Sequence, residues 1–200
     1  MKSEQFSRFC LHPWHGVSVG EKAPEVVTTY IEISPLAPIK YELDKESGLL
    51  RLDRMQKTAS VPPAHYGFIP QTYCGARSAA LTEGATEGDG DPLDVCLLSE
   101  FPIVPGALVD CRVIGVVRLI DGGEADDKII GVVNGDPFFA NVKDISDLPA
   151  VMVDRLEHYF TYYKAYKDKP VTMKIESILG KQAAYESIKA AQADYATLVG

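Results

Sequence analysis

The chain has 200 residues, 46% of them hydrophobic, and its 28 acidic residues outnumber its 20 basic ones to give a formal net charge of −8. This length suits one domain with a substantial buried core, and the apolar share excludes a disordered or low-complexity chain. The negative charge argues against a general binder of nucleic acid or of anionic membranes, because such a protein needs a basic face.

The first half of the chain indicates strands joined by turns. We expect residues 1–25, which mix Gly, Pro and polar residues, to form an irregular lead-in. Segment 62–70 contains too many prolines for a central strand or a helix, and the small, polar, Gly-punctuated segment 75–88 is typical of a loop. Apolar and β-branched residues predict three strands, the last two flanking a turn-like KESG: residues 26–33, 39–43 and 49–53.

The second half predicts more strands and then helices. Apolar runs predict strands at residues 93–98, 108–119 and 128–133. Beyond Asp147 and Pro149, which together mark a helix start, apolar residues recur at helical spacing as far as Tyr163. A short strand near residues 171–177 precedes a second helix over 181–198. Strands followed by helices predict an α+β domain, with a barrel or strongly curved sheet packed by helices.

The cysteines and the N-terminus indicate a cytoplasmic protein. The four cysteines have no C-x-x-C spacing, so we expect buried or incidental thiols in a reducing compartment rather than a structural zinc site. The N-terminus lacks the continuous apolar core of a signal peptide, and no segment has the length of apolar residues needed to cross a bilayer.

The excess of acid is concentrated in one stretch. Residues 78–111 contain seven acidic residues and no Lys or Arg, whereas the other 166 residues hold 21 acids and 20 bases. On charge alone, a solvated loop explains this stretch as well as a functional acidic segment does.

A run within that stretch, DGDPLDV at residues 89–95, brings three carboxylates close together. Such carboxylates repel one another unless cations hold them, and carboxylate oxygens are ligands for hard cations such as Mg²⁺. Asp89 and Asp91 are two residues apart, so an extended backbone would direct both to one side. An EF-hand calcium loop is the competing interpretation, but Asp94 stands where that loop requires Gly.

Three further elements carry candidate residues. A second acidic cluster, residues 121–128, lies between two predicted strands and taken alone favours a polar hairpin loop. Polar residues on the early strands, Glu32, Lys40, Glu42 and Arg54, are either exposed surface pairs or the wall of a cavity that binds phosphate oxygens. Tyr163 and Lys164 fall on the first predicted helix, where Tyr163 also continues the apolar stripe.

Together these segments resemble the soluble family I inorganic pyrophosphatases. DGDPLDV is similar to the signature of that family, and residues 31–54, the acidic cluster 121–128 and the YYK at residues 162–164 follow in the family's order. The resemblance extends from about residue 26 to Lys164. It implies a fold of α+β class, a small five-stranded closed β-barrel (OB-like) with helices packed outside, formed by one domain over residues 1–200.

The resemblance also implies an activity and roles for thirteen residues. The activity is Mg²⁺-dependent hydrolysis of inorganic diphosphate (pyrophosphate) to two phosphates, with several Mg²⁺ ions per subunit and a water activated by a carboxylate base. Asp91 would be the base; Asp89, Asp94, Asp121 and Asp126 would hold Mg²⁺; Glu32 and Glu42 would lie in the cavity; and Lys40, Arg54, Tyr66, Lys128, Tyr163 and Lys164 would contact phosphate. It further implies a homo-oligomer, with a hexamer favoured, and no nucleic-acid or membrane partner.

The chain departs from the family pattern at three places. Pro62 stands where many relatives have Tyr, Gly122 where Glu is frequent, and the loop at residues 75–88 is longer than in common bacterial members. Two interpretations from other classes remain: an OB-like module for single-stranded nucleic acid, which the charge opposes, and a structural calcium protein.

Overall fold

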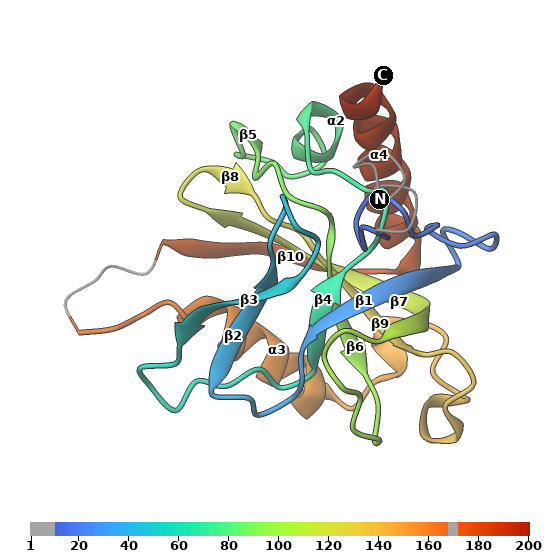
Figure 1. The fold of residues 1–200 in the computed structure, drawn as a ribbon. Coiled ribbons are helices and arrows are strands. Elements are labelled where there is room, and N and C mark those ends of the chain that lie inside the picture. Colours follow the sequence, from blue (N-terminus) through green and yellow to red (C-terminus); the bar gives the residue numbers. More distant parts are fainter. Residues whose placement is uncertain (1–10, 168–171) are drawn as a thin grey trace, which may run out of the picture.

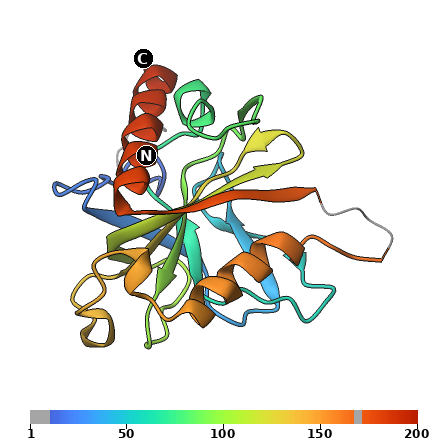
Figure 2. The same cartoon turned by 180° about the vertical axis from the view of Figure 1, so that it is seen from behind.

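The computed structural model describes residues 11–167 and 172–200, drawn as a ribbon in Figures 1 and 2. It contains strands, two long helices and several short helical turns. The strands are β1 Val26–Ile33, β2 Ile39–Leu43, β3 Leu50–Met55, β4 His65–Phe68, β5 Glu87–Gly88, β6 Asp94–Leu98, β7 Leu108–Asp121, β8 Glu124–Ala125, β9 Lys128–Val133 and β10 Met173–Gly180. The helices are α2 Ala76–Ala79, η1 Pro137–Phe139, η2 Ile145–Asp147, α3 Ala150–Tyr162 and α4 Lys181–Val199.

Five of the strands close into a ring. The pairings run β1–β4–β6–β9–β7 and return from β7 to β1, with β6–β9 parallel and the others antiparallel. The pairs β7–β10, β7–β8 and β5–β8 extend the sheet from this ring. The ring places the ends of strands that are distant in sequence beside one another, at the end of the molecule where the acidic segments lie.

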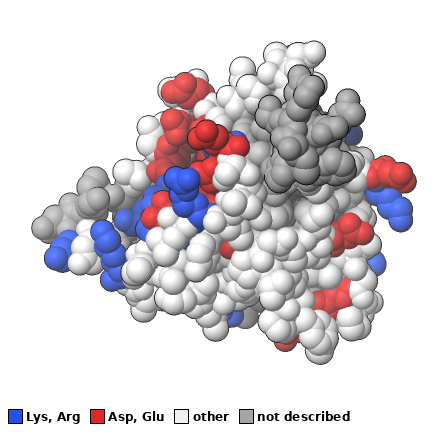
Figure 3. Space-filling model, viewed as in Figure 1, with Lys and Arg blue, Asp and Glu red and all other residues white. Residues whose placement is uncertain are grey.

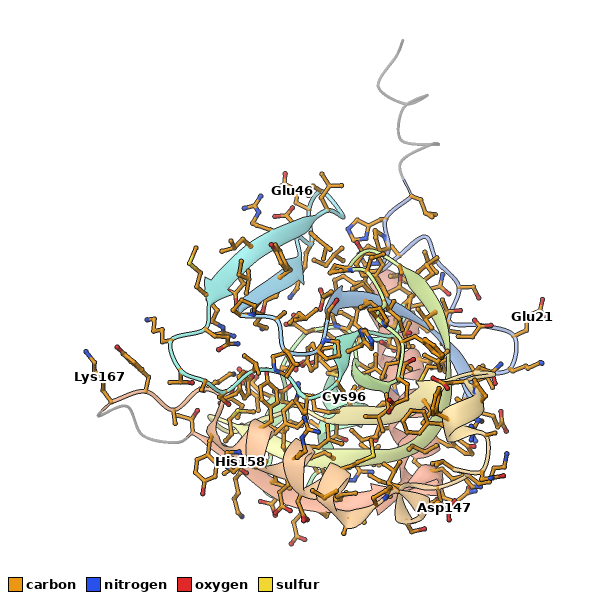
Figure 4. The ribbon with its side chains drawn as sticks, turned by 90° about the horizontal axis from the view of Figure 1, so that it is seen from below. Glu21, Glu46, Cys96, Asp147, His158 and Lys167 are labelled. Carbon is orange, nitrogen blue, oxygen red and sulfur yellow. The ribbon has the colours of Figure 1, made fainter. Side chains whose placement is uncertain are left out.

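The hairpin of β2 and β3 forms a separate two-stranded sheet. It lies in front of the ring in Figure 1, and Figure 4 shows Glu46 at its tip. The side chains of β3 are mostly exposed, so the hairpin covers the ring with little core of its own.

The core lies on both faces of the ring strands. Leu156 and Phe160 of α3 pack in one apolar cluster, whereas Ala184 and Ile188 of α4 pack in another. Cys96 of β6 is buried in the cluster that contains Leu156 and Phe160, and it lies near the centre of Figure 4. Burial on two faces explains why β7 and β9 have nearly continuous apolar sequences.

Most predicted elements are present. Strands β1, β2 and β9 have the predicted bounds, and β3, β6 and β7 differ from theirs by one or two residues. Helix α3 begins after Pro149, as predicted, and α4 ends one residue later than predicted. Strand β10 begins at Met173; residue 171 of the predicted strand lies outside the described residues. Of the predicted lead-in, residues 11–25 contain turns without a strand or helix, as expected, and residues 1–10 lie outside the described residues.

Two predictions about segments of the fold were wrong, and a third was incomplete. Segment 62–70 contains the ring strand β4, because its prolines lie outside the four residues that pair with β1 and β6. Segment 75–88 contains α2 and β5 rather than loop alone. Residues 121–128 do contain a hairpin turn, between Asp121 and Glu124, but the prediction did not include β8, which pairs with both β5 and β7.

Among the residues that the structure describes, no helix is long and apolar enough to span a membrane. That one domain occupies residues 1–200 stays a prediction.

Candidate active site

A cavity of about 250 Å³ opens between the β2–β3 hairpin and one end of the strand ring. Its wall contains all thirteen residues named from the sequence: Glu32, Lys40, Glu42, Arg54, Tyr66, Asp89, Asp91, Asp94, Asp121, Asp126, Lys128, Tyr163 and Lys164. Sequence reasoning assigned no role to six other lining residues: Trp14, Leu43, Lys45, Phe68, Pro92 and Glu124. Figure 3 shows acidic side chains directly beside basic ones over the hairpin and the loops above it.

The first acidic loop is a turn, which corrects the expectation of an extended backbone. Gly90 has a φ of +74°, a conformation that glycine adopts without steric cost, and the Asp91 N–H donates to Asp89 Oδ1 at 2.9 Å. The Gly90 N–H donates to the Cys74 carbonyl at 3.1 Å, and the Cys74 N–H donates to the Asp91 carbonyl at 2.8 Å. Asp89 and Asp91 therefore reach the same cavity through a turn held at both ends.

Asp94 lies at the start of β6, opposite Lys128 of the parallel strand β9. Its carboxylate accepts hydrogen bonds from the Tyr66 hydroxyl and from the Lys128 ammonium. Because β4, β6 and β9 are adjacent in the ring, three residues that are far apart in sequence meet at one point of the cavity.

The second acidic segment contributes from two strand ends. Asp121 ends β7, accepts a hydrogen bond from Thr172 Oγ1 at 2.8 Å and pairs with Lys164. Asp126 comes just before β9 and pairs with Lys128. The rigid strand ends thus fix two carboxylates beside those of the first acidic loop.

The hairpin supplies the more basic side of the cavity. Lys40 pairs with Glu42, and Arg54 pairs with Asp53 at 3.0 Å. The Lys40 side chain is only 16% exposed although it lies on a hairpin, so the alternative of a simple exposed surface pair does not describe it. Glu32 of β1 is buried beneath the hairpin and accepts a hydrogen bond from the Leu43 N–H at 2.7 Å.

Tyr163 and Lys164 do not lie within α3, which corrects their predicted position. The helix ends at Tyr162, and Tyr163 is the residue that caps it. The Tyr163 ring stacks on Tyr159 at 5.0 Å between centroids, so the apolar packing predicted from the stripe is present. The chain turns after the cap and directs Lys164 toward Asp121.

Two charged residues of the cavity wall, Lys45 and Glu124, were not predicted from the sequence, for different reasons. Lys45, at the hairpin tip, pairs with Asp91, and nothing in the sequence distinguished it from an exposed turn lysine. Glu124 stands inside the second acidic cluster, so its presence in an acidic segment was a usable signal.

Burial and the charges of neighbouring groups shift the pKa values of the cavity residues. Burial, with a smaller contribution from the Asp94 charge, raises the pKa of Glu32 to about 8. Burial and the nearby Asp126 charge raise the pKa of Asp89 above its ordinary value. Burial alone would lower the pKa of Lys128, but Asp126 and Asp94 outweigh that effect and raise it well above the usual range.

The donor set fits a hard cation. In residues 11–167 and 172–200, no three His, Cys, Asp or Glu side chains stand close enough together to make a ready-formed ligand group. Lysines instead hold the carboxylates: Lys128 contacts Asp94 and Asp126, Lys45 contacts Asp91, and Lys164 contacts Asp121. Asp91, Asp94, Asp121 and Asp126 thus each have an ammonium group beside them, and the acidic donors are all oxygens, as Mg²⁺ prefers.

The cavity wall combines eight carboxylates with five basic side chains. The carboxylates are suited to hard cations, and Lys and Arg are suited to phosphate oxygens. The fold and the site are therefore suited to a protein that acts on a phosphate compound together with cations.

Comparison with known proteins identifies the family. The family model described as inorganic pyrophosphatase matches residues 29–196. The chain is 43% identical over 205 residues to an inorganic pyrophosphatase of Chlamydia caviae, covering 96% of this chain and 94% of that one. It is 36% identical to soluble inorganic pyrophosphatase 4 of Arabidopsis thaliana, covering 94% of this chain and 80% of that one.

Comparison with a solved structure leads to the same family. The crystal structure of inorganic pyrophosphatase from Thermus thermophilus superposes with a TM-score of 0.79 at 37% identity, covering 94% of this chain and 99% of that one. The chain belongs to the inorganic pyrophosphatase family and is a hydrolase of that class.

Proposed function

We propose that the protein hydrolyses inorganic diphosphate to two phosphates in a reaction that depends on Mg²⁺. The observation that carries the proposal is the cavity itself, where carboxylates of the ring face basic side chains of the hairpin. Diphosphate is a dense cluster of negative oxygens, so an acidic site binds it only when cations bridge the two.

Four carboxylates would hold the metal ions: Asp89, Asp94, Asp121 and Asp126. Each of the four lies at a strand end or directly beside one, so the sheet fixes the positions of their backbones. Bound Mg²⁺ supplies Lewis-acid activation of a water and stabilises charge on phosphate oxygens. Several ions per subunit are consistent with the number of carboxylates.

Asp91 would be the general base. Its side chain is 48% exposed and lines the cavity, so a water molecule can reach it. Its backbone is fixed by the hydrogen bonds to Asp89 and Cys74. An aspartate in this position takes the proton of the attacking water, a contribution that is worth roughly 10²–10⁴ in rate.

The basic residues would hold the two phosphates. Lys40 and Arg54 project from the hairpin, whereas Lys128 and Lys164 project from the ring side. Positive charge on both sides stabilises the negative charge that develops on the leaving phosphate. The hydroxyls of Tyr66 and Tyr163 would add hydrogen bonds, with Glu32 and Glu42 completing the wall between them.

Phosphate release tests the proposal. We would measure phosphate from diphosphate with Mg²⁺, with EDTA, and with Asp91→Asn; we expect release only with Mg²⁺, and a loss of at least about 100-fold in the variant. Asp110→Asn is the matched control, because Asp110 is an exposed residue outside the cavity wall. Full activity of Asp91→Asn would contradict the proposed base, and no phosphate from the parent protein would contradict the function.

Three further proposals come from the same resemblance. We propose that the ring of five strands is a small OB-like barrel, that the protein works in the cytoplasm, and that it forms a homo-oligomer, with a hexamer favoured. Light scattering during size-exclusion chromatography tests the last of these; a monomeric mass across micromolar concentrations would contradict it.

A further inference from the structure

A buried polar cluster lies behind the cavity and does not contribute to its wall. It consists of Thr82, Arg118, Asp127 and Ser187, each at most 8% exposed. The Arg118 guanidinium donates to Asp127 Oδ2 at 2.8 Å. Thr82 Oγ1 donates to Asp127 Oδ1 at 2.8 Å, and Ser187 Oγ donates to Asp127 Oδ2 at 3.2 Å. Asp127 is thus held by three donors from three separate segments.

The position of Asp127 in the chain links this cluster to the active site. Its two neighbours, Asp126 and Lys128, both line the cavity, whereas Asp127 does not. Consecutive side chains in an extended segment point to opposite sides. The hydrogen bonds of the Asp127 carboxylate therefore hold the backbone that carries Asp126 and Lys128, on the side away from the cavity.

The donor Thr82 belongs to the long segment 75–88, which also joins the two acidic loops directly. Glu87 and Gly88 of β5 pair in parallel with Glu124 and Ala125 of β8. The Thr86 N–H donates to the Gly123 carbonyl at 2.9 Å. Asp89 follows β5 immediately, and Asp126 follows β8 immediately. The segment therefore sets how far the first acidic loop stands from the second.

Stability alone is a weak explanation for this cluster. A buried ion pair commonly contributes little more to stability than well-packed apolar residues of the same volume, because both charges must leave water. What the cluster does provide is a single position for the peptide that carries two cavity residues, with each oxygen of Asp127 satisfied.

We propose that Asp127 is a positioning residue for metal binding, held by Arg118, Ser187 and, from the long segment, Thr82. The inference rests on the metal assignment proposed above for Asp89 and Asp126. It assigns a role to the long segment: its Thr82 hydroxyl and its β5 strand keep the carboxylates of the two acidic loops at the separation that the metal ions require.

Metal affinity, measured without turnover, tests the inference. Mn²⁺ binding would be titrated by electron paramagnetic resonance on the full chain, in parallel with thermal unfolding in EDTA. We expect Asp127→Asn to weaken Mn²⁺ binding by about tenfold, as is typical when a residue that orients metal ligands is changed. Thr82→Val should weaken it less, and Thr82→Ser, which keeps the hydroxyl, should restore parent affinity.

The matched control is Asp136→Asn. Asp136 is also a buried aspartate that accepts a hydrogen bond from a serine, Ser99, but it lies beyond the opposite end of β9. The Asp136→Asn variant should be less stable than the parent but bind Mn²⁺ with the same affinity. This result would separate an effect on the position of the metal ligands from general destabilisation.

The outcomes are distinct. Folded Asp127→Asn with Mn²⁺ affinity within twofold of the parent overturns the inference, as does a control that loses as much affinity. If Asp127→Asn does not fold, the comparison of Thr82→Val with Thr82→Ser decides, and equal affinities overturn the inference. A parent protein that binds no Mn²⁺ contradicts instead the metal assignment of the proposed function.

Discussion

Lys128 is the single residue on which the charges of the cavity most depend. It is 1% exposed, and its ammonium contacts the carboxylates of both Asp94 and Asp126. These two acids come from different strand ends and would repel each other without it. A buried lysine stays charged here because the buried Asp126 and the half-buried Asp94 face it.

We expect Lys128→Met to lower the free energy of unfolding by about 3–5 kcal/mol in EDTA, because the buried Asp126 and the half-buried Asp94 both lose the partner of their carboxylates. Urea denaturation measures the change. Lys164→Met is the matched control: its ion pair with Asp121 is partly exposed, with 32% of the lysine side chain accessible, so the loss should stay near 1 kcal/mol or less. Equal losses for the two variants would contradict the role of burial.

At the scale of elements, the two-residue strand β5 depends on a glycine. A Cβ on Gly88 would lie 2.2 Å from the Cys74 carbonyl oxygen, which is a backbone atom that cannot rotate away. Glycine at this position lets the segment before Asp89 pass directly beside the segment at Cys74. The close approach sets the position of the first acidic loop.

We expect Gly88→Ala to destabilise the fold by about 3 kcal/mol or more, because the added methyl forces the backbone to shift. Thermal unfolding and phosphate release measure the effect, and activity should fall with stability. Gly135→Ala serves as the control, since a Cβ there meets nothing within 4 Å and costs only the strain of its φ of +89°. A smaller loss at Gly88 than at Gly135 would count against this close approach.

The start of α2 is anchored to α4 by Asp194. Its carboxylate, 4% exposed, accepts hydrogen bonds from the N–H groups of Gly75, Arg77 and Ser78, and it pairs with the Arg77 guanidinium at 3.0 Å. Burial would raise the pKa of Asp194, but these hydrogen bonds outweigh it and hold the pKa below its ordinary value.

This depressed pKa predicts how stability changes with pH. Ionised Asp194 stabilises the fold above the pKa of an unfolded aspartate, about 3.9, and that contribution is lost as the pH falls through the lower folded value. Asp194→Asn should therefore cost about 2 kcal/mol at pH 7, and the cost should shrink below about pH 4. Urea unfolding of both proteins at pH 7, 5 and 3.5 measures it; a cost that does not change with pH would contradict the assignment.

At the scale of the whole molecule, we expect the acidic cluster to make stability depend on cations. If Mg²⁺ binds only the folded chain, a concentration one hundred times its Kd adds about 2.7 kcal/mol, or about 5–11 °C in Tm for a chain of this size. Differential scanning fluorimetry with Mg²⁺, against NaCl at equal ionic strength, measures the rise. Equal Tm values in the two salts would show that the carboxylates bind no Mg²⁺ specifically.

The sequence predicted those parts of the fold and site that have a local signal. Continuous apolar runs identified β7 and β9, and the acidic run identified Asp89 and Asp94. Strand β4 was missed because flanking prolines masked four residues whose partners are distant in sequence. Strands β5 and β8 were missed because two-residue strands exist only through their pairing.

The same distinction holds for the site. Residues in charged motifs were found, whereas Lys45 was missed because only the folded hairpin brings it to Asp91. The position of Lys164 beyond α3 was also hidden, because the turn after Tyr162 depends on tertiary contacts such as that with Asp121. Long-range pairing, which no local pattern encodes, accounts for most of the difference between prediction and structure.

The separate β2–β3 sheet gives the two sides of the cavity different stiffness. Closing the ring leaves its five strands without a free edge between them, whereas a two-stranded ribbon is only marginally stable on its own. Thermal motion should therefore be greater on the side of Lys40 and Arg54 than on the side of Asp94 and Asp126. We expect product to leave when the β2–β3 hairpin is displaced, while the carboxylates of Asp94 and Asp126 keep their positions for the next turnover.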